Sequence, residues 1–175
     1  MRKLAFILLG LTLPPAASMP VLAAEVTTGH YVIDAMAMKP SKVNFATAYV
    51  IDRVTGLRNI ATATACFSAG LHLPHGMTIK RVTVTYASGS AGHPSVAVVR
   101  NPFIALGGDD SELVSSDTLI GNGGTPKTAD LSLNGSITTI DNRHYSYGFG
   151  ICLGGAENDK FYSARITYSN QPPTD

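Results

Sequence analysis

Two histidines three positions apart, in 71-LHLPHGMTIKRVTVTY-86, are the residues whose type and spacing most suggest chemistry. His72 and His75 could bind a metal ion or act as bases. On one strand, however, an odd separation puts two side chains on opposite faces, and a zinc site needs three or four ligands. Pro74 and Gly76 instead predict a corner between two strands. We therefore expect a solvated His72 on the outer face of the first strand and His75 in the turn, rather than a metal site.

Acidic residues in a glycine-flanked loop, 107-GGDDSELVSSD-117, are the candidates for a calcium site, because Ca²⁺ takes several oxygen ligands from flexible loops. The candidate ligands are Asp109, Asp110, Glu112 and Asp117. Their spacing does not match an EF-hand, so a solvated turn is the favoured interpretation, with at most weak calcium binding. The loop 154-GGAENDK-160, with Glu157 and Asp159, is a weaker second candidate. No other cofactor is expected.

The sequence lacks the templates of familiar enzymes. It has no G-x-S-x-G elbow, no H-E-x-x-H motif and no Walker loop. A glycosidase needs two carboxylates on either side of a cleft, whereas Asp109 and Asp110 are adjacent in one loop. We therefore expect a non-catalytic module that acts in binding or as a structural or interaction partner. The alternative is a small secreted hydrolase acting on glycans or esters.

Aromatic residues bear on sugar binding, because sugar-binding sandwiches usually stack an exposed aromatic ring on the sugar. The chain has no Trp. Most of its tyrosines fall on the inward side of the expected strands, so we expect them to be buried in the core. Tyr31 and Tyr49 are the remaining candidates for an aromatic platform. The expected partner is an unknown extracellular protein or a glycan.

The start of the chain has the pattern of a secretory signal peptide. A basic 1-MRK-3 precedes 4-LAFILLGLTL-13, an apolar run too short to span a bilayer comfortably, and 21-VLA-23 fits a signal-peptidase site. We expect cleavage after Ala23, with Ala24 as the second choice, and a periplasmic or extracellular location. An uncleaved anchor or buried helix is the alternative. No later stretch is long and apolar enough to cross a membrane.

The charge balance argues against two classes of partner. The chain has 13 Lys and Arg against 12 Asp and Glu, and loss of Arg2 and Lys3 with the signal peptide leaves the mature chain slightly acidic. Nucleic-acid binding depends on a basic field that neutralises phosphates. No basic amphipathic helix suggests membrane binding. We therefore expect neither nucleic acid nor a membrane surface as a partner.

The pattern along the remaining chain is that of β-strands. Alternation with a period of two, typical of strands buried on one side, occurs in 66-CFSAGLHL-73, 82-VTVTY-86, 144-HYSYGFGICL-153 and 161-FYSARITY-168. In the last of these, Ala164 and Ile166 share a face with Tyr162 and Tyr168, and Phe161 lies on the other. The run 95-SVAVVR-100 is a further strand, and Asn134-Gly135 favours a hairpin turn within 129–140.

Short strands with turn-rich connections predict the fold class. We expect an all-β protein, a single two-layer antiparallel β-sandwich that is jelly-roll-like, over residues 24–169. The stretch 43-VNFATAYVIDRV-54 reads as strand or helix about equally. The tail 170–175 is expected to be disordered.

These pieces resemble a loosely defined set of secreted bacterial β-sandwich proteins. The matching motifs are the LP-x-G turn 73-LPHG-76, the alternating strand 79-IKRVTVTY-86, the Tyr-rich strand 145-YSYGFGICL-153 and the closing strand 161-FYSARITY-168. The resemblance covers residues 64 to 169 and implies a small extracellular jelly-roll-like sandwich. The set has no agreed activity, so no catalytic residue is carried over. The segment 87-ASGSAGHP-94 departs from the Asp-Asn type loop of the set, which puts an acidic-loop function in doubt.

The two cysteines, Cys66 and Cys152, lie on the outward parity of their strands, and an exported chain meets an oxidising compartment. Neighbouring strands would let them form a disulfide; the alternative is two unpaired thiols on separate sheets. If the strands are antiparallel with the cysteines opposite one another, His72 faces Ser146 and has His144 as its diagonal neighbour. The sequence therefore predicts a Cys66–Cys152 bridge and a surface histidine pair, His72 and His144, with His75 apart.

The expected export predicts the N-terminal residue of the mature protein. Because the signal sequence is expected to be cleaved after Ala23, the native protein should begin at Ala24. Intact-mass spectrometry of the protein from its own host should show a species that lacks residues 1–23. Recovery of the full-length chain from the cytoplasm would contradict this prediction.

Overall fold

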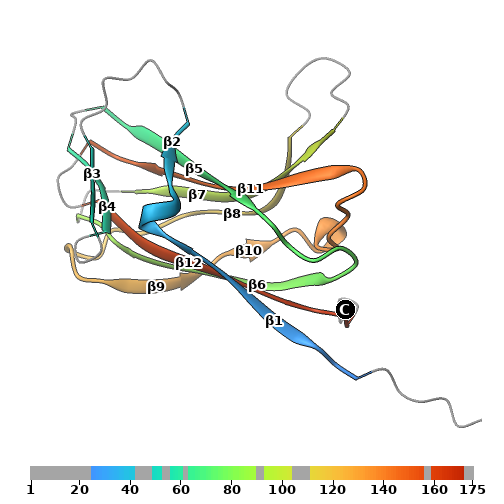
Figure 1. Cartoon of the computed structure of the whole chain (residues 1–175). Helices are drawn as coiled ribbons and strands as arrows, with labels where there is room; N and C mark the ends of the chain where they lie inside the picture. Colours follow the sequence, from blue (N-terminus) through green and yellow to red (C-terminus); the bar gives the residue numbers. More distant parts are fainter. Residues whose placement is uncertain are drawn as a thin grey trace, which may run out of the picture.

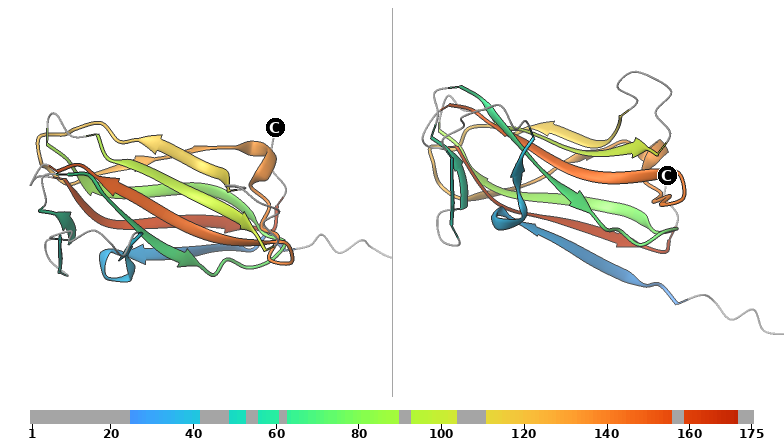
Figure 2. Two further views of the ribbon diagram at one scale, coloured as in Figure 1. Left: turned by 90° about the horizontal axis from the view of Figure 1, so that it is seen from above. Right: turned by 45° about the horizontal axis from the view of Figure 1, so that its top comes forward.

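The protein consists of two antiparallel β-sheets packed face to face (Figures 1 and 2). The computed structural model describes residues 25–41, 49–52, 56–60, 63–89, 93–103, 111–155 and 159–171. The expected signal peptide, residues 1–23, and the end of the tail, residues 172–175, lie outside them. None of the helices among the described residues is long and apolar enough to cross a membrane.

One layer, called sheet A, is built around two long central strands. Its strand order is β3 (Tyr49–Asp52), β4 (Gly56–Asn59), β12 (Lys160–Ser169), β6 (Thr78–Ala87) and β9 (Lys127–Asp130). The first strand, β1 (Thr28–Asp34), pairs with residues 163–169 of β12, and β4 pairs with Lys160 and Phe161 of β12. Both lie on the side of β12 opposite β6. A 3₁₀ turn, η1 (Ala35–Ala37), follows β1 and is capped by the Asp34 side chain.

The other layer, sheet B, places the Tyr-rich strand near its middle. Its order is β10 (Ser132–Leu133), β8 (Glu112–Thr118), β7 (Ser95–Pro102), β11 (Tyr145–Leu153), β5 (Ala65–Leu71) and β2 (Lys39–Pro40). The connections from β4 to β5, β5 to β6 and β6 to β7 each cross between the sheets. This alternation is typical of jelly rolls, and the predicted two-layer antiparallel sandwich is confirmed.

Alternating residues on the central strands build the core between the sheets. On β11, Tyr147, Phe149 and Ile151 are buried. Across the sandwich, Phe149 packs against Phe161 of β12, with ring centroids 5.5 Å apart. Each such side chain contributes about 2–3 kcal/mol by leaving water. The period-two pattern therefore identified the inner face of β11 correctly.

The last strand departs from the simple alternation expected for it. The pairing of β12 with β6 shifts between Phe161 and Ser163, which is a β-bulge at Tyr162. An extra residue reverses the parity of everything before it. As a result Phe161 is fully buried and shares the inner face with Ala164 and Ile166, whereas Tyr162 is only half-buried. The assignment of Phe161 to the outer face was wrong.

The expected Asn134–Gly135 hairpin is also wrong. Asn134 precedes a 3₁₀ turn, η2 (Gly135–Ile137), and Gly135 has no positive φ angle. The chain then crosses to sheet A, where Ile140 N–H donates to the Met77 carbonyl and Ile79 N–H donates to Thr138. Ile140 is fully buried at this end of the sandwich. Burial of this apolar side chain against sheet A outweighs the local preference of Asn-Gly for a tight turn.

The corner predicted at 73-LPHG-76 is confirmed. The strand β5 ends at Leu71, and β6 begins at Thr78. Gly76 has φ +77°, a conformation that other residues rarely adopt. His72 is exposed just beyond β5, and His75 is exposed in the turn.

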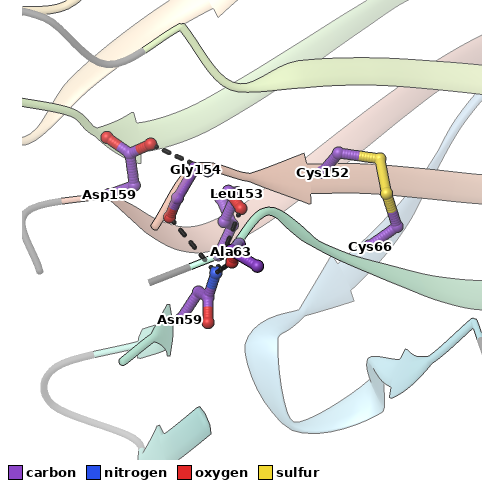
Figure 3. Close-up of a disulfide and its surroundings, with 7 residues drawn as sticks. All are labelled: Asn59, Ala63, Cys66, Cys152, Leu153, Gly154 and Asp159. Carbon is purple, nitrogen blue, oxygen red and sulfur yellow. Dashed lines mark hydrogen bonds between the residues drawn. A yellow bond between two sulfur atoms is a disulfide. The ribbon is translucent and has the colours of Figure 1, made fainter. Parts of the chain in front are cut away.

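A disulfide joins the two strands on which the cysteines were predicted to lie. Cys66 and Cys152 are directly opposite in the β5–β11 register, with Cα atoms 3.9 Å apart (Figure 3). The pairing continues from Leu153–Ala65 to Tyr147–Leu71, in the predicted register. The disulfide prediction is therefore confirmed.

Buried polar side chains tie together the loops near the disulfide (Figure 3). Asn59 is fully buried and its side-chain amide donates to the carbonyls of Ala63, Leu153 and Gly154, at 2.7, 3.3 and 3.3 Å. The buried carboxylate of Asp159 accepts from Gly154 N–H at 3.0 Å and from the Ser88 hydroxyl at 2.7 Å. A buried carboxylate needs such donors. Asp159, considered as a calcium ligand, therefore has a structural role, and Glu157 lies outside the described residues.

The disulfide should contribute strongly to stability, because it closes a long loop with a sequence separation of 86. The double variant Cys66→Ala with Cys152→Ala should lose up to about 4 kcal/mol of unfolding free energy. Urea unfolding followed by circular dichroism measures the loss, and non-reducing peptide mapping of the wild type establishes the bridge. Two free thiols in the oxidised native protein would contradict the structure.

Candidate binding face of sheet B

The two outer faces of the sandwich differ in side-chain size. The outer face of sheet A carries long polar ladders: the Thr83 hydroxyl donates to Asp130 at 2.6 Å, and Arg81 lies 3.7 Å from the same carboxylate. His30 pairs with the Thr167 hydroxyl at 3.2 Å. Such a face is covered by its own charged and hydroxyl side chains.

Small residues predominate along the middle of the outer face of sheet B, between Lys39 on β2 and Leu113, which is 51% exposed, on β8. One row crosses the whole sheet through directly paired positions: Lys39, Ser68, Gly150, Ala97, Ser116 and Ser132. The next row toward the corner contains Gly70, Gly148 and Val99. The middle strand β11, which lies between β5 and β7 (Figure 1), therefore presents Ser146, Gly148, Gly150 and Cys152 outward. The result is a low floor with hydroxyl groups around it.

Packing does not require these outward glycines. A Cβ atom at Gly70 would meet no atom within 4 Å, and one at Gly150 would meet only the Phe67 carbonyl, at 3.7 Å. None of the glycines of this face has a positive φ angle. Gly56 is different, because it has φ +74° and its Cβ would lie 2.5 Å from the Phe161 carbonyl. Glycine at Gly56 serves the fold, whereas the glycines of sheet B leave open space over its surface.

The first hollow, called hollow 1, lies over the disulfide end of this face and has a volume of about 510 Å³. Gly150, Ala97 and the Cys66–Cys152 bridge form its floor. Hydroxyl groups surround it, from Ser41, Ser95, Ser116 and Thr118. Asp117 is the one acidic residue among its described lining residues. The chemistry of hollow 1 is that of a hydrogen-bonding surface with little charge.

A second hollow, called hollow 2, lies at the other end of the same face and has a volume of about 540 Å³. Its lining combines apolar, amide, imidazole and hydroxyl groups, from Gly70, His72, Pro74, Phe103, Asn142 and Ser146. The Phe103 side chain is 61% exposed. An exposed aromatic ring beside polar donors and acceptors is typical of a site for an amphipathic ligand.

The walls of hollow 2 are held by hydrogen bonds to one turn, residues 141–144. The Asn142 side chain donates to the Leu73 carbonyl at 2.6 Å, and Phe103 N–H donates to the His144 carbonyl at 3.0 Å. The neighbouring Tyr145 ring lies under the Arg100 guanidinium, 4.2 Å from its carbon atom. These contacts fix the turn and the aromatic wall relative to β11.

Asp141 organises the histidines of this turn. His144 Nδ1 lies 2.6 Å from one carboxylate oxygen of Asp141, and His75 Nδ1 lies 3.8 Å from the other. Asn142 N–H also donates to His75 Nδ1 at 3.1 Å. The hydrogen bond from His144, followed by that from Arg143 N–H, lowers the pKa of Asp141 below its ordinary value. The expectation that His75 stands apart was wrong, because Asp141 links it to His144.

The predicted pair His72 and His144 is not joined by a hydrogen bond or ion pair in the described part of the chain. The β5–β11 pairing stops at Leu71 and Tyr147, one residue before His72 would face Ser146. His72 and Ser146 nevertheless line the same hollow. His144 has the Asp141 carboxylate as its partner instead. The sequence register therefore located His72 correctly but missed the acidic residue that orients His144.

Two of the four candidate calcium ligands, Glu112 and Asp117, are among the described residues. Glu112 binds Arg100 through Nε at 3.2 Å and Nη2 at 2.6 Å. Asp117 is exposed and accepts from Thr118 N–H at 2.7 Å. Asp109 and Asp110 lie outside the described residues, within which no group of three acidic, histidine or cysteine residues could hold a metal ion. Calcium binding stays a weak prediction.

The candidate aromatic platforms lie away from the hollows. Tyr31 is on β1 and is partly buried against the core. Tyr49 is 37% exposed but packs against the buried Phe67, with ring centroids 5.4 Å apart. The exposed ring beside a hollow belongs to Phe103, which the sequence did not single out as a candidate. Its position before a loop, outside any alternating run, was the available signal.

Comparisons with known proteins find likeness only among solved structures. No protein-family model and no curated protein matches the sequence. An endo-1,4-β-D-xylanase 10B from Clostridium thermocellum, complexed with xylohexaose, matches with TM-score 0.44 and 9% identity over 78% of this chain. This chain spans about a quarter, 26%, of that xylanase chain. The resemblance to secreted bacterial sandwiches stays a prediction.

Two smaller proteins match over most of their own length. A Stig cyclase from Fischerella sp. TAU matches with TM-score 0.35 and 16% identity, covering 89% of this chain and 93% of the other. A family 11 carbohydrate-binding module from C. thermocellum, in complex with a β-1,3-1,4-mixed-linked tetrasaccharide, matches with TM-score 0.32 and 15% identity, covering 81% and 87%. At these values the matches carry no conclusion about this chain.

The lowered pKa of Asp141 gives the turn a defined pH dependence. A carboxyl with a depressed pKa in the folded protein stabilises the fold fully above its ordinary value of 3.8, and the gain is lost as the pH falls through the folded value. Asp141→Asn should therefore lower the melting temperature at neutral pH, and the difference from wild type should shrink below about pH 3.8. Thermal unfolding across pH measures this, with the exposed Glu25→Gln as control. A constant difference down to the most acidic pH would contradict the role of the Asp141 carboxylate.

Proposed function

We propose that this protein is a secreted, non-catalytic carbohydrate-binding module that uses the outer face of sheet B. The observation that supports this most strongly is hollow 2, where the exposed Phe103 ring adjoins Asn142, His72 and Ser146. A sugar ring has an apolar face that packs on an aromatic ring and a rim of hydroxyls that need hydrogen-bond partners. Hollow 2 offers both kinds of contact within one concave surface.

The charges of the two hollow linings favour a neutral ligand, because neither lining contains a Lys or Arg among the described residues, and Lys39 and Arg100 lie outside both. Hollow 1 is surrounded by serine and threonine hydroxyls, and Asp117 is the one acidic residue among its described lining residues. In hollow 2, His72 is the one ionisable side chain among the polar wall residues, beside the phenols of Tyr145 and Tyr147. An anionic polymer would need Arg or Lys partners. A neutral polysaccharide needs only the hydroxyl, amide and imidazole groups that are present.

A protein partner fits the face less well. Protein interfaces rely on buried aromatic and arginine anchors around a packed core. The floor along β11 instead consists mainly of Gly, Ala and Ser, which supply little area for such anchors, and the large exposed side chains Leu113 and Phe103 belong to β8 and to the end of β7. The disulfide adds support for a location outside the cytoplasm, since such bonds persist in oxidising compartments.

Removal of the exposed ring tests the proposal. Phe103→Ala should weaken binding about tenfold or more, because a stacked aromatic contact and its buried area are lost. Native affinity electrophoresis through gels containing xylan, mixed-linked β-glucan, mannan, starch or chitin measures retardation of both proteins. Val32→Ala, which shortens an exposed apolar side chain on β1 of sheet A, is the control. Wild-type protein that is retarded by none of these polysaccharides would refute the proposal.

A further inference from the structure

Hollow 1 and hollow 2 lie on one line along strand β11. Hollow 2 includes Ser146, and hollow 1 includes Gly150 and Cys152. Gly148 lies between them on the same outward side of the strand. We propose that the two hollows are the ends of one trough that binds a linear, uncharged polysaccharide chain lying parallel to β11. This inference rests on the proposed carbohydrate-binding function and specifies the form of its ligand.

The floor between the hollows is formed by glycine main chain, with no side chains rising from it at Gly148 and Gly70. Gly148 faces Gly70 on β5, so that two adjacent strands lack side chains at the same level. Val99 of β7 stands on the other side of Gly148. The neighbouring row continues the track, with Gly150 between Ser68 and Ala97. A chain molecule on this floor would therefore meet no side chain beneath it at Gly148 and Gly150, with Val99 on its β7 side and, one row further, Ser68 and Ala97 on its two sides.

The length of the track suits an oligosaccharide rather than a single sugar. Six residue steps separate Ser146 from Cys152, and at ~3.3 Å per residue in a strand they span roughly 20 Å. A monosaccharide would occupy only one hollow. Polar groups at both ends, Asn142 and His72 in hollow 2 and Ser95 and Thr118 in hollow 1, would fix a longer chain along the trough.

The outward glycines of β11 lower the stability of the strand, and the packing of the fold does not require them. Glycine weakens a strand interior because it loses the most conformational freedom on folding and has no side chain to pack. A Cβ at Gly148 would meet Val99 Cγ2 at 3.6 Å and the Ala69 carbonyl at 3.8 Å, which is ordinary contact. The sandwich would thus accept a side chain here. A ligand that passes over the strand provides a reason for its absence.

An extended peptide is a poorer occupant of this trough. Peptides that bind along strands gain affinity from main-chain hydrogen bonds at a free sheet edge. The β11 backbone is already paired with β5 on one side and β7 on the other. The trough therefore offers side-chain hydroxyls and an apolar floor, but no strand edge.

The test separates the trough from the hollows by blocking only the floor between them. Gly148→Leu places a side chain between hollow 1 and hollow 2 and leaves the lining residues of both unchanged. The ligands are the disaccharide, tetrasaccharide and hexasaccharide cut from the polysaccharide of the gel panel that retards the protein most. Calorimetric titration measures each affinity. Thr85→Leu, an outward substitution on β6 of sheet A, is the matched control, and circular dichroism checks that both variants fold.

For the wild type and Thr85→Leu, we expect affinity to rise about tenfold or more from the disaccharide to the hexasaccharide. Gly148→Leu should bind the disaccharide as the wild type does but lose the gain with length. Equal hexasaccharide binding by Gly148→Leu and wild type would overturn the continuous trough while leaving the proposed function intact. Wild-type protein that binds no carbohydrate of the panel would overturn both, and so would a preference for extended peptides over glycans.

Discussion

The alignment of β5 with β11 is the constraint on which the rest of the structure depends. Because side chains alternate strictly along a strand, a slip of one residue would send Phe149 and Ile151 to solvent and bring the glycines into the core. The Cys66–Cys152 bridge fixes this register covalently, and Phe149 packing against Phe161 fixes which side of β11 faces sheet A. The same alignment places Gly70 opposite Gly148 and so creates the low floor of the outer face.

The two faces of sheet B therefore have different roles: the inner face forms the core, and the outer face is open to a ligand. The inner side of β11 is filled with large apolar residues that hold the sheets together, and its outer side has almost no side chains. Glycines cost a strand roughly 0.5–1 kcal/mol each relative to alanine. A disulfide at the end of the same strand, worth up to about 4 kcal/mol, more than offsets that cost. A weak strand thus remains ordered, with its outer surface free for a ligand.

The sequence predicted what depends on alternation and failed where a single residue interrupts it. Parity identified the inner face of β11 and the disulfide partners, and Pro74 with Gly76 predicted the corner. It misassigned Phe161, because the bulge at Tyr162 shows only when β12 is paired with β6. Asn134–Gly135 favours a hairpin locally, but burial of Ile140 against sheet A decided the path of the chain. The site was harder still, because hollow 2 brings together segments near residues 70, 103 and 142 that no local pattern connects.

The turn that holds Asn142 and Phe103 links the surface chemistry of this end to the fold. Asp141 N–H donates to the buried Tyr147 hydroxyl at 2.8 Å, and its carboxylate contacts His144. The His144 carbonyl in turn holds Phe103 N–H. A chain of hydrogen bonds therefore runs from the core side of β11, through the Asp141 turn, to the aromatic wall of hollow 2. The main chain of Phe103 is thereby held by the strand whose outer face forms the floor, which lowers the cost of ordering this wall when a ligand binds.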